Sequence, residues 1–554
     1  MGDPRIKKSS YREFQGRSLE PILLKDDSKQ PQIKRAKTST GLTPYIGTWG
    51  KEQAAHLIKR CSFGVQKEEL NQLSSLTMDE AVDLILTPNP IQNQPVNDYS
   101  DYGEDPHADP GETWIGKPYH GEVEILRVIS LKNFMLKSYF NAGMNIHPKM
   151  TLFWHNIIPT QYFLIEFGNL SYNYFKILND NALGNYKDIV TQVTTDPSML
   201  AYLNGAFNVK EAPDENYARE LQELFTVGKG PDSGYTESDV FEAARVLTGW
   251  TIDYDGAFNR GEANYLFFPQ NHDTGDKVFS EFYGNRTISG KSGQDGSSET
   301  DELIDMILET QEAAKYICRR LYNFFVYHDV DESVETNVIT PLADIFRSNN
   351  YDIQPVLSAL FKSEHFYDTA NIGAYVKNPL DHMVGLYRSF DTELPADITE
   401  EFDFLYETYF LANDLGMAVG DPPSVSGWQA YYQQPSFDKL WINSDTIINR
   451  ARYQDHLIFN RMDVVKFASS LDQPSDPDEL IIESNQLLQG IPLSEETISD
   501  LKSNLLVGQT DDYWVNAWND YENNPENEEY RSTVTNRLQA LFRQLFQLAE
   551  FQLT

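Results

Sequence analysis

Charged side chains recur at helical spacing in residues 216–225, which read Asn-Tyr-Ala-Arg-Glu-Leu-Gln-Glu-Leu-Phe. Glu220 and Glu223 are three residues apart, so both carboxylates can project toward one cation. Arg219 and Glu223 are four residues apart and can form an ion pair on the neighbouring helix face. Two interpretations stay open: a site for acid–base or cation chemistry, or the ion-paired face of a solvated helix.

A second group lies in the loop of residues 270–275, Gln-Asn-His-Asp-Thr-Gly. A histidine beside an aspartate can bind a metal ion, or act as a base that the carboxylate orients. His272 and Asp273 are therefore candidate site residues. The alternative is a turn that the Asp273 side chain stabilises by bonding to its own backbone.

Two further segments combine aromatic and polar residues. His155 follows Trp154 on a largely apolar helical pattern, which is typical of a hydrogen-bonded core histidine, with metal ligation as the alternative. Residues 422–428, Pro-Pro-Ser-Val-Ser-Gly-Trp, contain no ionisable side chain and look structural, as the wall of a pocket would.

Familiar catalytic and metal-binding motifs are absent from the sequence. It contains no GxSxG nucleophile motif, phosphate-binding loop, HExxH motif or GxGxxG turn. It has two cysteines and no CxxC pair, which argues against a thiolate zinc site. Cys61 and Cys318 lie in apolar helical patterns and are expected to be buried thiols, with one disulfide as the alternative.

Two helices must position the first group of residues. The apolar spacing predicts one helix over residues 215–227 and another over residues 237–247. Gly228 is placed to end the first helix as a C′ glycine. Thr236 is expected to be the N-cap of the second helix, with Asp239 three residues later.

The rest of the chain repeats the helical period, and strand-like material is minor. Residues 265–268 form an aromatic run that favours a short strand or hairpin inside a stretch rich in Gly, Asn and Asp. We therefore expect a mainly α protein, a large multi-helix domain with a minor β-hairpin insertion. Three parts are predicted: a flexible basic tail over 1–42, a helical core over 43–460, and a C-terminal helical extension over 461–554 packed on the core.

Composition excludes several classes of function. The formal net charge is −38, and a field of that sign repels phosphate backbones, so nucleic acid is not an expected partner. No run of eighteen apolar residues occurs, so no transmembrane segment is expected. The N-terminus lacks the apolar core of a signal peptide, which predicts a cytoplasmic chain as written, or one exported by a signal already removed.

Taken together and in this order, these motifs resemble the bacterial domain of unknown function 1800 family. The resemblance extends over roughly residues 43–460. It rests on the segments 56–60 with 63–64, 152–156, 215–228, 235–250, 272–277, 321–326, 376–388, and 422–428 with 441–443.

The resemblance implies a mostly helical fold without an assigned activity. It also implies a sulfatase- or phosphatase-like partner protein and a place at or outside the cell envelope. One departure concerns His155. Family members commonly carry a second histidine two residues later, where this chain has Ile157, so a metal role for His155 is in doubt.

Two hypotheses about function follow. In the first the protein is a hydrolase: Glu220, Glu223 and His272 supply acid–base chemistry, Asp273 orients His272, and Arg219 holds an anionic group. A divalent cation would be held by His272, Asp273, Glu220 and His155. In the second the protein is a non-enzymatic envelope or assembly protein whose polar cluster is a buried structural network. A shared, solvent-connected pocket favours the first hypothesis, and sealed, mutually bonded side chains favour the second.

Overall fold

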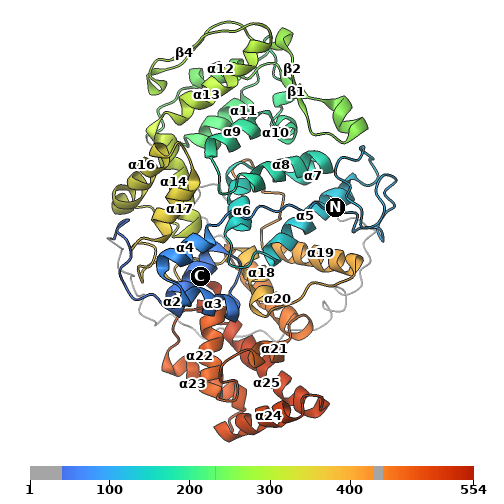
Figure 1. The fold of residues 1–554 in the computed structure, drawn as a ribbon, viewed down its shortest axis with the longest axis vertical. Helices are drawn as coiled ribbons and strands as arrows, with labels where there is room; N and C mark the ends of the chain where they lie inside the picture. The colour runs from blue at the N-terminus through green and yellow to red at the C-terminus, as the bar shows by residue number, and fades with distance from the viewer. Residues whose placement is uncertain (1–39, 231, 429–440) are drawn as a thin grey trace.

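The computed structural model describes residues 40–230, 232–428 and 441–554 and confirms a mainly helical fold with two small β insertions (Figure 1). Helices α5 to α8 cross the middle of the view. The sheets lie with α12 and α13 at the upper end, and helices α21 to α25 form the lower end. Apart from residues 40–42, the expected basic tail lies outside the described residues.

The first part of the chain is a series of helices, in which α5 packs against α8 and α6 also packs against α8. Their bounds are α2 (Lys51–Cys61), α3 (Lys67–Ser75), α4 (Met78–Ile85), α5 (Glu124–Phe140), α6 (His147–Ile157), α7 (Tyr162–Ile165), α8 (Gly168–Asp180) and α9 (Tyr186–Thr195).

The middle part carries the β structure. The aromatic run forms β2, which pairs antiparallel with β1 in the register Trp250 to Phe267, and this confirms the expected hairpin. A second two-stranded pair, β3 with β4, was not expected. The elements are α10 (Pro197–Tyr202), η1 (Gly205–Phe207), α11 (Glu215–Glu220), η2 (Leu221–Thr226), α12 (Glu237–Val246), β1 (Trp250–Ile252), η3 (Gly256–Arg260), β2 (Tyr265–Phe267), η4 (Pro269–Asn271), β3 (Lys277–Val278), η5 (Glu281–Tyr283), β4 (Thr287–Ile288) and η6 (Gly293–Ser298).

The last part is again helical. Residues 511–523 form a helix, α24, that the apolar spacing did not predict, because it buries two tryptophans and otherwise carries polar residues. The elements are α13 (Glu299–Leu308), α14 (Gln311–Phe325), α15 (Glu332–Val334), η7 (Glu335–Ile339), α16 (Thr340–Ser348), α17 (Ile353–Phe361), α18 (Pro379–Ser389), α19 (Ile398–Asp414), α20 (Thr446–Asn460), α21 (Val464–Ser469), α22 (Pro477–Leu488), α23 (Glu495–Leu506), α24 (Asp511–Asn523), α25 (Glu528–Phe546) and η9 (Glu550–Gln552).

One hydrophobic cluster extends along the whole described chain, from α2 to α25. It contains Leu57 on α2, Leu386 on α18 and Phe542 on α25, all nearly inaccessible to solvent. Helix α25 packs on α20 and α21, and residue Leu553 forms a β-bridge with Val376. Burial of apolar surface is therefore continuous across residue 460.

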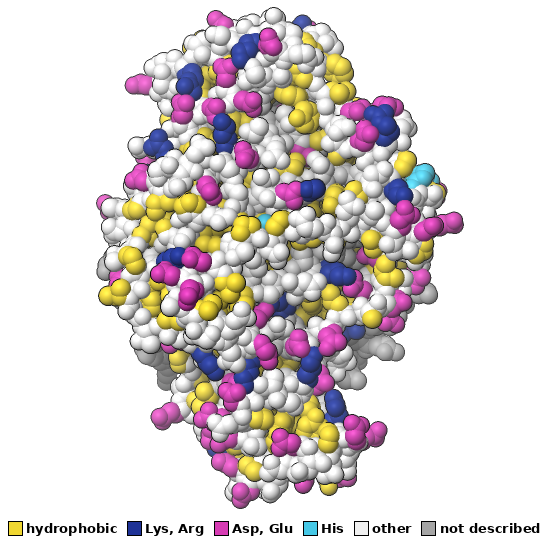
Figure 2. All heavy atoms as spheres, viewed as in Figure 1, with side chains coloured by type: hydrophobic (Ala, Val, Ile, Leu, Met, Phe, Trp, Pro, Cys, Tyr) yellow, Lys and Arg dark blue, Asp and Glu magenta, His cyan; other side chains and the backbone are white. Residues whose placement is uncertain are grey.

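The charged surface and the two cysteines show no local clustering. Acidic side chains are spread over the visible face rather than gathered into one patch (Figure 2). Both cysteines are buried free thiols, as expected, and they form no disulfide. Within the described residues, no helix combines the length and the apolar character that crossing a membrane would require.

Candidate functional site

The helix that carries the first group of residues changes type at its centre. Residues 215–220 are α-helical, whereas η2 is a π-helix in which the Val227 N–H donates to the Gln222 carbonyl at 2.9 Å. The expected single α-helix over 215–227 is therefore wrong in its second half. The buried Gln222 side chain explains the change in part, because it donates to the Ala218 carbonyl and accepts from the Tyr283 hydroxyl at 2.8 Å. π-Helical turns inside helices are frequent at functional sites.

The ends of both helices follow the expected signals. Gly228 follows Val227, the C-cap of η2, with a φ of +83°, and a Cβ there would collide with the Tyr316 ring. Thr236 caps α12 by accepting the Asp239 N–H, while the Asp239 carboxylate accepts the Thr236 N–H at 2.7 Å. Glycine and the capping box thus set the turn between the two helices.

Glu220 and Glu223 form a carboxyl pair at the junction of α11 and η2. Glu220 is half-buried; burial, and next the negative charge of Glu223, raise the pKa of Glu220 to about 7. Lys229 and Arg219 oppose this shift. Glu223 is nearly buried and its carboxylate forms an ion pair with the Lys229 ammonium. The Lys229 ammonium therefore supplies a positive charge beside Glu223.

The spacing had suggested an ion pair between Arg219 and Glu223, but Arg219 binds other carboxylates. Its guanidinium binds Glu237, the first residue of α12, at 2.6 Å, and Glu215, one turn earlier on α11, at 3.0 Å. The partner changes because the turn after Gly228 returns the chain and places α12 beside α11. Arg219 therefore ties the two helices together at a partly exposed position.

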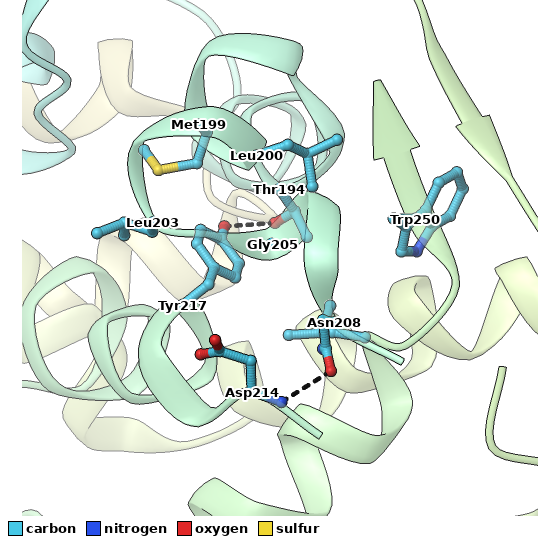
Figure 3. Close-up of a pocket in the computed structure, with 10 residues that line it drawn as sticks. Thr194, Met199, Leu200, Leu203, Gly205, Asn208, Asp214, Tyr217 and Trp250 are labelled. Carbon is cyan, nitrogen blue, oxygen red and sulfur yellow. Dashed lines mark hydrogen bonds between the residues drawn. The ribbon is translucent and has the colours of Figure 1, made fainter. Parts of the chain in front are cut away.

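A small pocket is lined by a residue of α11 that precedes Glu220 by about one helical turn (Figure 3). Tyr217, which lines it, is three residues before Glu220 on α11 and bonds the Thr194 hydroxyl at 2.8 Å. Burial, and next the charges of Asp421 and Glu220, raise the pKa of Tyr202 on α10 to about 12, which places Glu220 near that helix. The enclosed space amounts to about 10 Å³, which is room for no more than about one water molecule. Its lining is Thr194, Met199, Leu200, Leu203, Gly205, Asn208, Asp214, Tyr217, Leu247 and Trp250.

His272 belongs to a sealed network. The ring is 1% exposed, with Nδ1 at 2.9 Å from the Thr248 carbonyl and Nε2 at 3.2 Å from Oε1 of the fully buried Glu299. Glu299 also binds the buried Lys277 ammonium and accepts the Lys291 N–H at 2.6 Å. Burial alone would raise the pKa of Glu299, but these donors hold the pKa below its usual value.

Asp273 does not orient His272. Its carboxylate receives two parallel hydrogen bonds from Arg245, at 2.9 and 3.0 Å, and a third from the Gly275 N–H. Partial burial would raise the pKa of Asp273, but these hydrogen bonds outweigh it and keep the pKa low. The bond to the Gly275 N–H, two residues on, is the Asx-type turn that was the alternative interpretation. The Thr248 carbonyl takes the orienting role at Nδ1, and Nε2 lies near Glu299 without a hydrogen bond to it.

His155 is a buried ring on α6. Its Nε2 lies 3.2 Å from the Thr160 carbonyl, and its ring stacks on Tyr162 with centroids 5.1 Å apart. Burial lowers the pKa of His155 to about 4. The segment 422–428 packs here, because the Asn156 side chain accepts the Trp428 N–H at 2.9 Å and Gly427, at a φ of +89°, approaches the Asn156 backbone too closely for a Cβ. Residues 429–440 lie outside the described residues.

The expected site residues therefore fall into three separate groups. Among residues 40–230, 232–428 and 441–554, no three His, Cys, Asp or Glu side chains are arranged so that they could hold a metal ion. The lining of the Figure 3 pocket includes none of Glu220, His272 and His155. His272 and His155 are sealed, whereas Glu220 keeps access to solvent.

Three important partners were not identified from the sequence. Lys229 follows Glu223 by six residues, and Lys277 and Glu299 follow His272 by five and twenty-seven, so no helical or strand period links these pairs. Lys277 lies within a segment that carried the resemblance, but nothing in the sequence associated its charge with His272.

A family model described as "Protein of unknown function (DUF1800)" matches residues 56–553. The match includes the C-terminal segment after residue 460, so the resemblance stated from the motifs was too short at that end. No curated protein and no solved structure matches the chain.

Proposed function

The chain belongs to the DUF1800 family, whose description assigns no reaction, and from the geometry above we propose that it is a hydrolase in which Glu220 exchanges protons with the substrate or with water. The observation that carries the proposal is the pKa of about 7 at a half-buried carboxyl group. General acid–base groups work best when their pKa lies near the working pH. Perturbed carboxyl groups of this kind concentrate at functional sites.

The surroundings of Glu220 support this role. Within the part of the chain that the structure describes, no hydrogen bond to its carboxyl group is found, so both oxygens remain available to a ligand. Glu223 keeps a negative charge beside it, and the Lys229 ammonium fixes the position of Glu223.

The test measures the proton and the reaction separately. Carbon-13 NMR of labelled glutamate should show one carboxyl group titrating near pH 7, and Glu220→Gln should remove that signal. In a panel of ester, phosphate, sulfate and glycoside substrates, the variant should lose about 10²–10⁴-fold of whichever activity the wild type has. Glu496→Gln, at an exposed position on α23, is the matched control and should change neither readout. A Glu220 that titrates near 4.5, or a variant with full activity, would exclude this role.

A second candidate function is a non-enzymatic envelope or assembly protein that acts with a sulfatase- or phosphatase-like partner. It is favoured by the sealed contacts of His272 with Glu299, because a network of that kind stabilises a fold and leaves no group free for a substrate. If the panel gives no activity and Glu220 titrates normally, this alternative is the better account.

A further inference from the structure

Four cationic side chains are buried together where the N-terminal helices meet the C-terminal segment. Lys59 on α2, Lys149 on α6, Lys377 before α18 and Arg450 on α20 are all at most 7% exposed. The buried carboxylate of Asp381 acts on three of them, Lys149, Lys377 and Arg450. Burying a charge without a counter-charge costs several kcal/mol, roughly, in real proteins.

Both carboxylate oxygens of Asp381 already have a side-chain partner. Its Oδ1 binds the Lys149 ammonium at 2.5 Å, and its Oδ2 accepts the Asn378 amide at 2.8 Å. Asp381 therefore forms its ion pair with Lys149, and among the described residues Lys59, Lys377 and Arg450 donate to backbone carbonyls or an amide and not to a carboxylate. Burial, and next the Lys377 charge, lower the pKa of Lys59 well below its usual value, and burial lowers the pKa of Lys377 to about 7.

A pocket opens between these cations. Its walls come from α2, α18 and the C-terminal segment, and helix α22 contacts both α2 and α18. It holds about two water molecules, which excludes large ligands. The lining is Lys59, Gly64, Lys377, Asp381, His382, Gly385, Leu386, Ser389, Leu488, Phe551 and Thr554.

The side chains around the pocket have unused hydrogen-bond donors. The Lys59 ammonium donates to the Gln486 carbonyl at 3.1 Å and the Lys377 ammonium to the Leu488 carbonyl at 3.2 Å. An ammonium has three N–H groups, so two on Lys59 remain without an acceptor among the described residues. The Lys377 ammonium also lies over the Phe551 ring, 4.1 Å from its centroid, which leaves one of its N–H groups for a further acceptor.

His382 contributes a donor of the same kind. Its Nε2 lies 3.4 Å from the Gln454 amide nitrogen, which is a donor, so Nε2 accepts and the ring proton is on Nδ1. His382 is 1% exposed and its Nδ1 has no partner among the described residues. Buried donors without acceptors are rare in folded proteins, and a bound ion is one way to satisfy them.

We propose that this pocket binds one small inorganic anion, such as chloride, phosphate or sulfate, between Lys59, Lys377 and the Nδ1–H of His382. The anion supplies the missing counter-charge and accepts the unused hydrogen bonds. Because Lys59 belongs to α2 and the lysine acceptors Gln486 and Leu488 belong to α22, the bound anion also holds the C-terminal segment against the body of the protein. The site is separate from Glu220 and does not depend on the function proposed above.

The experiment titrates the full chain with sodium chloride, phosphate and sulfate by isothermal calorimetry, after dialysis into a zwitterionic buffer without these anions. Saturable binding of one anion per chain is expected for at least one of the three. Lys59→Met and Lys377→Met should each weaken it at least ten-fold. Lys176→Met, at an exposed position on α8, is the control and should bind as the wild type does.

The melting temperature, measured with and without anion, is a second readout and needs only one of the two variants to fold. Without anion, Lys377→Met should melt at or above the wild-type temperature, because it removes a buried charge that lacks a partner. With saturating anion the order should reverse, because only the wild type gains binding energy.

Crystals of the wild type soaked in bromide give a direct answer. Anomalous density between Lys59 and Lys377 supports the proposal. It is overturned if none of the three anions binds saturably, if both methionine variants bind as tightly as the wild type, or if bromide occupies other places and not this pocket.

Discussion

At the scale of single residues, the neighbours of a buried carboxyl group decide its pKa in this protein. Glu299 is fully buried, and three donors around it keep its pKa below the usual value. Glu220 is half-buried beside another carboxylate, and its pKa rises to about 7. The same kind of side chain therefore stays ionised in one place and titrates near neutral pH in the other, which is the basis of the role proposed for Glu220.

This contrast predicts a large loss of stability when Glu299 is neutralised. Glu299→Gln keeps the shape of the side chain but leaves the Lys277 ammonium buried without its counter-charge. The free energy of unfolding should fall by about 3–5 kcal/mol, as it does when one partner of a buried ion pair is removed. Urea unfolding followed by circular dichroism measures it.

The matched control is Glu302→Gln on the same helix, where a partly exposed carboxylate pairs with Lys291. It should cost at most about 1 kcal/mol, since exposed ion pairs contribute little. If Glu299→Gln costs no more than this control, the His272 network does not stabilise the fold.

At the scale of elements, the pair α11–η2 and α12 presents the carboxyl pair. The π-helical segment η2 follows Glu220 directly, and Gly228 with the Thr236 cap turns the chain back into α12. Arg219 and the Asp239 side chain then join neighbouring segments, the latter by accepting the Ser280 N–H at 2.7 Å. The first turn of α12 thus helps to hold the segment that carries Glu220 in place.

Thr236→Ala tests that support. It removes the oxygen that accepts the Asp239 N–H, so the unfolding free energy should fall by about 1 kcal/mol. Ser238→Ala, at an exposed position of the same helical turn, is the comparison and should be close to neutral. Thermal unfolding of both variants gives the difference, and equal melting temperatures would show that the cap contributes nothing measurable.

At the scale of the whole molecule, the net charge of −38 sets the long-range electrostatics. Acidic side chains cover the visible face broadly, and repulsion between them disfavours the compact state (Figure 2). Salt screens this repulsion, since the Debye length falls from about 30 Å at 0.01 M to about 3 Å at 1 M.

The urea midpoint of unfolding should therefore rise as sodium chloride increases over that range. Chloride can also act at the cationic pocket, so Lys377→Met serves as the control that removes this contribution. A rise that persists in Lys377→Met reports screening of the acidic surface. A midpoint that stays constant or falls in both proteins would show that surface repulsion does not limit stability.

Local spacing was enough to predict the features that depend on neighbouring residues. The helical period predicted a mainly α fold, Gly228 and Thr236 predicted where the turn lies, and the aromatic run predicted the β1–β2 hairpin. Each of these rests on interactions within a few residues or on backbone freedom, which the order of the residues determines directly.

Only the tertiary structure decided which polar groups meet. Glu223 pairs with Lys229, Asp273 with Arg245 and His272 with Glu299, and in each case a partner suggested by helical spacing or by adjacency is replaced. Within the π-helical turn, the Gln222 side chain likewise accepts a hydrogen bond from the Tyr283 hydroxyl, sixty-one residues away. A charged side chain buried on folding takes whichever counter-charge the packing brings near, because leaving it unpaired costs more than any preference set by spacing.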